Sequence, residues 1–213
     1  MILDLHVHSE LSDDSRAGVE TYLKVLQRKR EERPLDGVVL TEHRQWNEGI
    51  DYRHLEDRYE MKILRGAEVE TDYGHVLLYG VTPEMTARFD FADVRLPAQT
   101  LVKEVEQMGG LAVPCHPGRS HIGLCAHYEQ KPPLEGIRAV EAINGGSRGD
   151  EDAQTAVLIE EQGYASFGGS DAHLVAFIGL CATRFEDEIE TEQDLVTALR
   201  AGRCAAVDFR RGG

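Results

Sequence analysis

The sequence predicts an α/β protein whose strands form a barrel or an open sheet. Short apolar runs rich in Val, Ile and Leu alternate with longer amphipathic stretches, which is the pattern of β-α units around a buried parallel sheet. Nearly every apolar run leads into a histidine, an acidic residue or a glycine turn at its carboxyl end. Barrel enzymes place their chemistry at that edge of the strands, so this regularity favours the barrel.

The predicted elements follow from the period of the apolar residues. We expect strands at residues 2–5, 37–40, 61–67, 75–79, 111–114, 139–143, 164–167, 178–182 and 204–209. We expect helices at residues 18–32, 97–108, 150–162 and 191–200. Gly109-Gly110, Gly163 and Gly202 follow three of these helices and are predicted helix stops.

Length and composition predict one globular domain over residues 1–213. A chain of 213 residues can form one barrel-sized core, and 41% hydrophobic with 29% charged residues is an ordinary balance for a soluble protein. No repeat or low-complexity tract divides the chain, and the loosest predicted segment is 118–133. Without a bilayer-length apolar run or a signal-peptide pattern at residues 1–4, we expect a cytoplasmic protein that binds no membrane.

Charge and cysteine content exclude some classes of protein. The formal net charge of -15 argues against a surface for duplex nucleic acid, which requires clustered Lys and Arg, and it suits a protein that carries cations. Cys115, Cys125, Cys181 and Cys204 are too scattered for a disulfide framework or a zinc knuckle, so we expect small buried side chains.

The first apolar run ends in His6-Val7-His8, and residues two apart on a strand point to the same side, so both rings can reach one ion. Asp13 and Asp14 follow in a loop. Either aspartate could fold back over the same edge, or it could cap the next turn or helix.

The second and third predicted strands bring one histidine and one carboxylate to matching ends, at His43 and Glu68. Glu68 is the predicted bridge, because two carboxylate oxygens can span metals roughly 3.5–4 Å apart. Glu70 shares its face and is expected in solvent or behind the ligands. His75 opens the next strand after Tyr73-Gly74, either as a ligand or as a polar residue at a strand entrance.

Two further runs end in histidine motifs. His116 lies at a bend fixed by Pro117-Gly118, and Gly168-Gly169 precedes Asp171 and His173, which are two apart and can share one centre. Imidazoles mixed with carboxylates, without a thiolate cluster, favour zinc, manganese or iron.

Arginines could bind the phosphate oxygens of a substrate in pairs. Arg119 and Arg148 each follow a motif loop and are candidates, and Arg16 is as well explained by solvation. Of the remaining histidines, His54 is expected to be exposed, whereas His121 and His127 could line the pocket.

These motifs together resemble the PHP family, the polymerase and histidinol phosphatase domains, across nearly the whole chain. The similar segments are His6-Val7-His8-Ser9 with Asp13, Thr41-Glu42-His43, Glu68 with His75, His116-Pro117-Gly118, and Ser170-Asp171-Ala172-His173. The chain departs from many members at Ser12-Asp13-Asp14, which lacks a glycine, and at Glu42, where Asp is commoner.

The resemblance implies a distorted (β/α)7 TIM-like barrel with two or three divalent metal ions at its rim. The implied ligands are His6, His8, Asp13, His43, Glu68, His75, His116, Asp171 and His173. We expect Glu68, Asp171 and His173 to be catalytic, with Arg119 and Arg148 as phosphate contacts.

The sequence therefore predicts a metal-dependent phosphoric ester hydrolase in which a metal-activated water attacks a small phosphomonoester or nucleotide-type substrate. One alternative is an amidohydrolase-type enzyme, which would need a bridging lysine or an equivalent, and no predicted strand ends in lysine. The other alternative is a non-catalytic module that senses metal or a phosphorylated ligand. Oligomeric state is left open.

Overall fold

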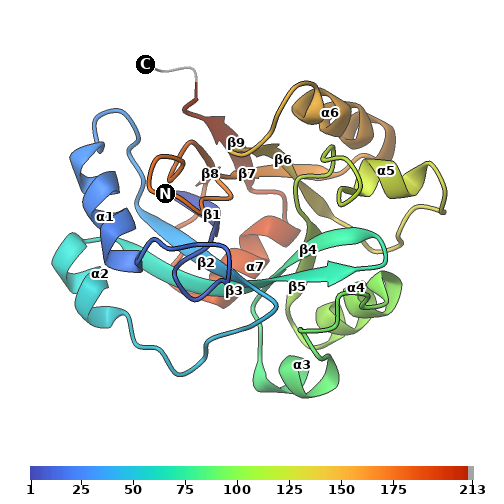
Figure 1. Ribbon diagram of the computed structural model, residues 1–213, viewed down its shortest axis with the longest axis horizontal. Helices are drawn as coiled ribbons and strands as arrows, with labels where there is room; N and C mark the ends of the chain where they lie inside the picture. The colour runs from blue at the N-terminus through green and yellow to red at the C-terminus, as the bar shows by residue number, and fades with distance from the viewer. Residues whose placement is uncertain (211–213) are drawn as a thin grey trace.

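A computed structural model describes residues 1–210, which fold around a curled seven-stranded sheet and a smaller two-stranded sheet (Figure 1). The large sheet has the order β5-β4-β3-β2-β1-β8-β9, and the small sheet pairs β6 with β7. The strands are β1 (Ile2–Val7), β2 (Gly37–His43), β3 (Lys62–Thr71), β4 (Gly74–Tyr79), β5 (Leu111–Pro114), β6 (Ala139–Asn144), β7 (Ala165–Gly169), β8 (Cys181–Phe185) and β9 (Cys204–Asp208).

Helices lie around the outside of these sheets and at one end of the core (Figure 1). They are α1 (Val19–Arg28), α2 (Arg53–Tyr59), α3 (Pro83–Arg88), α4 (Ala98–Gln107), α5 (Leu124–Tyr128), α6 (Glu151–Gln162) and α7 (Glu192–Arg200). The four predicted helices correspond to α1, α4, α6 and α7, whereas the short α2, α3 and α5 were not predicted. Within residues 1–210, each helix is too short or too polar to cross a membrane.

The α/β class is confirmed, but the predicted sevenfold β/α alternation is not observed. Strands β1, β2 and β3 are parallel, whereas β4 runs antiparallel to both β3 and β5, and β8 runs antiparallel to β1. Between β3 and β4 a tight turn replaces a helix: Gly74 has φ +96° and Thr71 Oγ1 donates to the Gly74 carbonyl oxygen at 2.7 Å. A hairpin of this kind joins antiparallel strands only.

The small sheet lies against β1 and β8. Thr183 Oγ1 of β8 accepts from the Gly168 N–H at 2.9 Å and donates to the Gly168 carbonyl oxygen at 2.7 Å. A parallel bridge also joins Val7 to Ala172 just beyond β7. The segment after β7 that contains Ala172 is thereby held beside the end of β1.

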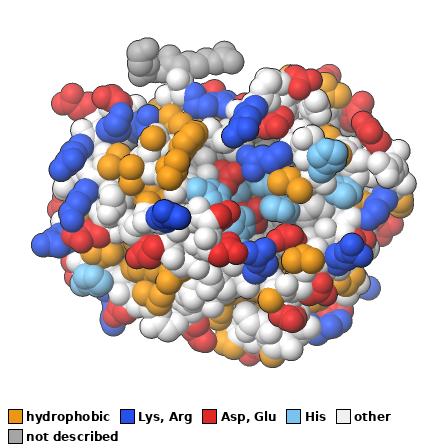
Figure 2. Space-filling view, viewed as in Figure 1, with side chains coloured by type: hydrophobic (Ala, Val, Ile, Leu, Met, Phe, Trp, Pro, Cys, Tyr) orange, Lys and Arg blue, Asp and Glu red, His pale blue; other side chains and the backbone are white. Residues whose placement is uncertain are grey.

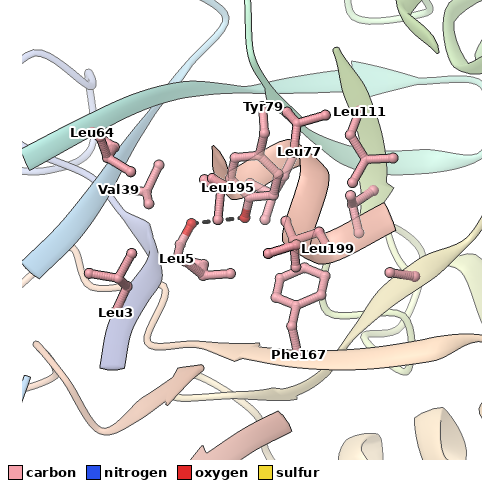
Figure 3. Close-up of a cluster of buried hydrophobic side chains, with 14 of the residues drawn as sticks. Leu3, Leu5, Val39, Leu64, Leu77, Tyr79, Leu111, Phe167, Leu195 and Leu199 are labelled. Atoms are coloured by element: carbon pink, nitrogen blue, oxygen red, sulfur yellow. Dashed lines mark hydrogen bonds between the residues drawn. The ribbon is translucent and has the colours of Figure 1, made fainter. Parts of the chain in front are cut away.

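The core under the strand ends is formed by side chains from most of the strands together with α7 (Figure 3). Leu195 and Leu199 of α7 are fully buried against Leu5 and Phe167. The buried Tyr79 hydroxyl donates to the Leu5 carbonyl oxygen at 2.9 Å, so its polar group is satisfied. This apolar cluster packs beneath the sheet edge where the predicted histidines and carboxylates lie.

One predicted helix stop and one predicted strand start can be compared directly with the backbone. Gly163 ends α6 in the left-handed region with φ +71°, as the helix-stop prediction requires. The strand predicted at 178–182 begins instead at Cys181, because Gly179 has φ +69° and the chain is still turning there.

Candidate metal centre

Histidines and carboxylates converge where β1, β2 and β3 end and β4 begins. His43 pairs with Glu68 across β2 and β3, and His75 pairs with Glu70 across β3 and β4. The antiparallel direction of β4 explains why His75, at the start of its strand, reaches the same edge. In the space-filling view, histidine and acidic side chains gather in a hollow near the middle of this face (Figure 2).

Glu68 lies at the centre of the cluster and is 1% exposed. Its Oε2 atom is 2.9 Å from His6 Nε2 and 3.0 Å from His8 Nε2. Its Oε1 atom is 2.7 Å from His75 Nδ1 and 3.2 Å from His116 Nε2. Each oxygen of this one carboxylate therefore faces a different set of histidines.

The motif Asp171-Ala172-His173, which follows β7, adds an aspartate and a histidine to the cluster. Asp171 Oδ1 is 3.4 Å from the Nε2 atoms of both His6 and His8, and His173 Nε2 is 3.2 Å from His43 Nε2. The Tyr22 hydroxyl lies 2.9 Å from the His8 carbonyl oxygen and 3.0 Å from the Ala172 carbonyl oxygen, so it links the two motifs.

The aspartate brought to the cluster is Asp14 and not the predicted Asp13. Asp14 Oδ2 is 3.3 Å from His43 Nε2 and 3.2 Å from His173 Nε2. The Asp13 side chain is 70% exposed and forms an ion pair with Arg44 at 2.6 Å. Arg44, which has φ +56° just after β2, binds both Asp13 and Glu70 through its guanidinium.

Acceptors behind the rings fix the histidine tautomers. His6 Nδ1 donates to Glu141 Oε1 at 3.0 Å, and His173 Nδ1 donates to the Asp171 carbonyl oxygen at 3.0 Å. Ser12 Oγ donates to Glu42 at 2.6 Å, so it can accept from His8 Nδ1 at 3.3 Å. In its neutral form, each of these three rings would present an Nε2 lone pair to the cluster, as metal-binding histidines do.

Charge at the cluster favours a cation. Burial alone would lower the pKa of His6, but Glu141, Asp171 and Glu68 raise it well above its ordinary value. Burial likewise opposes the charged form of Glu68, yet His6 and His116 hold the pKa of that carboxyl well below its usual range. Glu68 thus remains ionised and stabilises positive charge beside it, whether that charge is carried by protons or by metal ions.

The donor set fits divalent metal ions. Three groups have ligand atoms within 4.8 Å of one another: His6, His8, Glu68 and Asp171; His6, Glu68, Cys115 and His116; and His8, His43 and His173. Two ligands of one tetrahedral zinc ion lie about 3.4 Å apart, given bond lengths of about 2.1 Å. Glu68 Oε2 and Asp171 Oδ1 lie 2.9–3.4 Å from the Nε2 atoms of His6 and His8, which is close to that value.

Three residues of the site were missed by the sequence analysis. Glu141 on β6 is buried and binds His6, Glu42 accepts from Ser9 and Ser12, and Cys115 Sγ donates to Glu68 at 3.4 Å. Glu141 interrupts the apolar run over residues 139–143, which is a signal that could have identified it. All four cysteines are free, and the predicted burial holds for Cys115 and Cys181.

The two predicted phosphate contacts differ in position. Arg119 Nη1 donates to Asp171 Oδ2 at 2.9 Å, and its side chain is 23% exposed at the edge of the cluster. Arg148 is exposed, and its backbone N–H donates to Glu151. Arg16 is also exposed. His127, which could line the pocket, contacts the Tyr73 ring.

A family model and one known relative match parts of the chain. The family described as PHP-associated matches residues 154–204, a segment that includes Asp171 and His173. An uncharacterized protein of Methanocaldococcus jannaschii is 24% identical over 127 residues, which are 55% of this chain and 68% of that protein.

Solved structures share the fold. PsfC from Pseudomonas syringae has 22% identity and a TM-score of 0.70, covering 97% of this chain and 91% of that one. A putative metal-dependent phosphoesterase from Bifidobacterium adolescentis has 13% identity and a TM-score of 0.56, covering 94% and 96%. The PHP-associated match covers residues 154–204, and the solved structures show that the fold is shared over nearly the whole chain.

Proposed function

We propose that the chain is a metal-dependent phosphoesterase that hydrolyses a small phosphoester at a centre of two or three divalent ions. The observation that carries this proposal is the position of Glu68, whose two oxygens face different sets of histidines. A carboxylate in that position can bridge two ions. Zinc, manganese and iron all suit the imidazole and carboxylate donors.

Bound ions at such a centre supply Lewis acidity and lower the pKa of water towards neutrality. The chain's own residues hold the ligands in place and exclude bulk water: His6, His8 and Glu68 are each at most 1% exposed. Arg119 adds a fixed positive group beside Asp171, with N–H donors left over for the oxygens of a phosphoryl group.

The arginine also favours phosphoester over amide hydrolysis. A guanidinium beside the carboxylates matches the charge of a phosphoryl group. The net charge of -15 supports a small substrate rather than duplex nucleic acid.

Arg119→Ala is expected to raise the Michaelis constant for a phosphoester about tenfold or more while metal content stays unchanged, because Arg119 would bind substrate and not metal. Arg148→Ala, which alters an exposed side chain, is expected to have a much smaller effect. The Michaelis constant and the metal content of both variants are measured and compared with those of the wild type. Equal kinetics for wild type and Arg119→Ala would remove Arg119 from the substrate site.

The activity itself is tested with a panel of phosphomonoesters and phosphodiesters, assayed with added manganese or zinc, beside a panel of amides and lactones. We expect turnover on at least one phosphoester class. Hydrolysis confined to the amide or lactone panel would replace the proposal with the amidohydrolase alternative.

A further inference from the structure

A continuous chain of hydrogen bonds joins the histidine cluster to Arg119 through two buried residues that contact no predicted substrate. His6 Nδ1 binds Glu141 Oε1 at 3.0 Å, and Glu141 Oε2 accepts from Asn144 Nδ2 at 2.9 Å. Asn144 Oδ1 then accepts from Arg119 Nη2 at 3.0 Å. Arg119 Nη1 closes the path on Asp171, whose other oxygen faces His6.

The orientation of the Asn144 amide is set by its neighbours. The Gly146 N–H can only donate, and it lies 2.8 Å from Oδ1, while the Glu141 carboxylate can only accept, and it lies 2.9 Å from Nδ2. Asn144 is 1% exposed, so few other partners can reach it. Its carbonyl oxygen is therefore directed at the Arg119 guanidinium.

Asparagine suits this position for a chemical reason. The side chain must donate to a carboxylate on one side and accept from a guanidinium on the other, and a terminal amide does both. An aspartate would place two carboxylates in contact. Alanine would leave Arg119 held at Asp171 alone and would remove one donor from the buried Glu141.

We infer that Asn144 is a positioning residue that fixes the direction of Arg119 for a phosphoryl group, an inference that rests on the proposed function. With one N–H used at each of Nη1 and Nη2, three of the five guanidinium donors remain for a substrate. A side chain held in advance loses less conformational entropy when the substrate binds. Asn144 thereby raises affinity without touching the substrate.

Gly146, two residues after Asn144, is part of the same arrangement. A Cβ atom at Gly146 would lie 3.0 Å from Arg119 Nη2 and 3.1 Å from Asn144 Oδ1, so the two groups approach the backbone closely. Gly146→Ala would push on this contact without removing either hydrogen-bonding partner. It therefore provides a second way to disturb the Arg119 direction.

A double-mutant cycle tests the inference. Asn144→Ala, Arg119→Ala and the double variant are compared for metal content, Michaelis constant, turnover number and inhibition by inorganic phosphate. We expect Asn144→Ala to raise both the Michaelis constant and the phosphate inhibition constant about tenfold, with the turnover number within about threefold and metal content unchanged. In the Arg119→Ala background the same change should alter either constant less than about twofold.

Additive effects in the double variant would show that Asn144 acts elsewhere and would overturn the inference while leaving the phosphoesterase proposal intact. If Asn144→Ala folds poorly, Gly146→Ala takes its place in the cycle with the same expected non-additivity. A metal-loaded wild type that neither hydrolyses phosphoesters nor binds inorganic phosphate would overturn the proposed function and this inference together.

Discussion

Glu68→Gln is expected to lower turnover on a phosphoester by at least about 100-fold, the scale of removing a principal electrostatic stabiliser. The substitution keeps the shape of the side chain but replaces one charged oxygen with an amide nitrogen that is a poor ligand. Because the two oxygens of Glu68 face different histidines, the loss should weaken one ion more than the other. Metal analysis should show reduced occupancy beside the loss of activity.

Glu70→Gln is the matched control. Glu70 lies two residues along the same strand, but its carboxylate binds Arg44 at 2.9 Å and not a histidine of the cluster. We expect turnover within a few fold of wild type for this variant. Near-normal metal content and activity in Glu68→Gln would mean that Glu68 does not bridge, and the centre would have to be assigned to other carboxylates.

Removal of metal is expected to abolish activity and to lower the melting temperature by about 5–10 °C, the shift for a ligand at about 100 times its dissociation constant in a domain of this size. The candidate ligands come from strands β1, β2, β3 and β4 and from the segments after β5 and β7. Bound ions would therefore tie together several separate segments of the chain, and their loss would favour unfolding.

Calorimetry before and after dialysis against EDTA measures this effect, with zinc or manganese added back to restore both properties. An identical melting temperature after demonstrated metal loss would show that the ions do not contribute to stability. The catalytic part of the prediction would then have to be judged from activity alone.

Much of the cluster could be predicted because strand geometry is regular. His6 and His8 are two residues apart at the end of β1 and reach one group of ligands, as strand alternation predicts. Asp171 and His173 follow β7 in a turn where Asp171 has φ +52°, and they belong to different groups of ligands. His75 reaches the cluster for a reason that the sequence did not reveal. Its strand runs in the opposite direction, so its start and not its end lies at the cluster.

Other features depend on contacts between distant segments and could not be predicted. The choice between Asp13 and Asp14 is decided by Arg44, which lies 31 residues away from Asp13. Glu141 is 135 residues from His6, the ring that it orients. Arg119 and Arg148 both follow motif loops, yet only the loop after His116 directs its arginine towards Asp171.

The number of metal ions bound per chain tests the central claim most directly. Protein purified without chelator, loaded with zinc or manganese and freed of excess ion, is analysed by elemental mass spectrometry against an accurate protein concentration. The three overlapping groups of ligands and the central Glu68 predict at least two ions per chain. If protein exposed to excess ion then holds one ion per chain, or none, the result would contradict a multinuclear centre. It would also contradict the bridging carboxylate on which the proposed function is based.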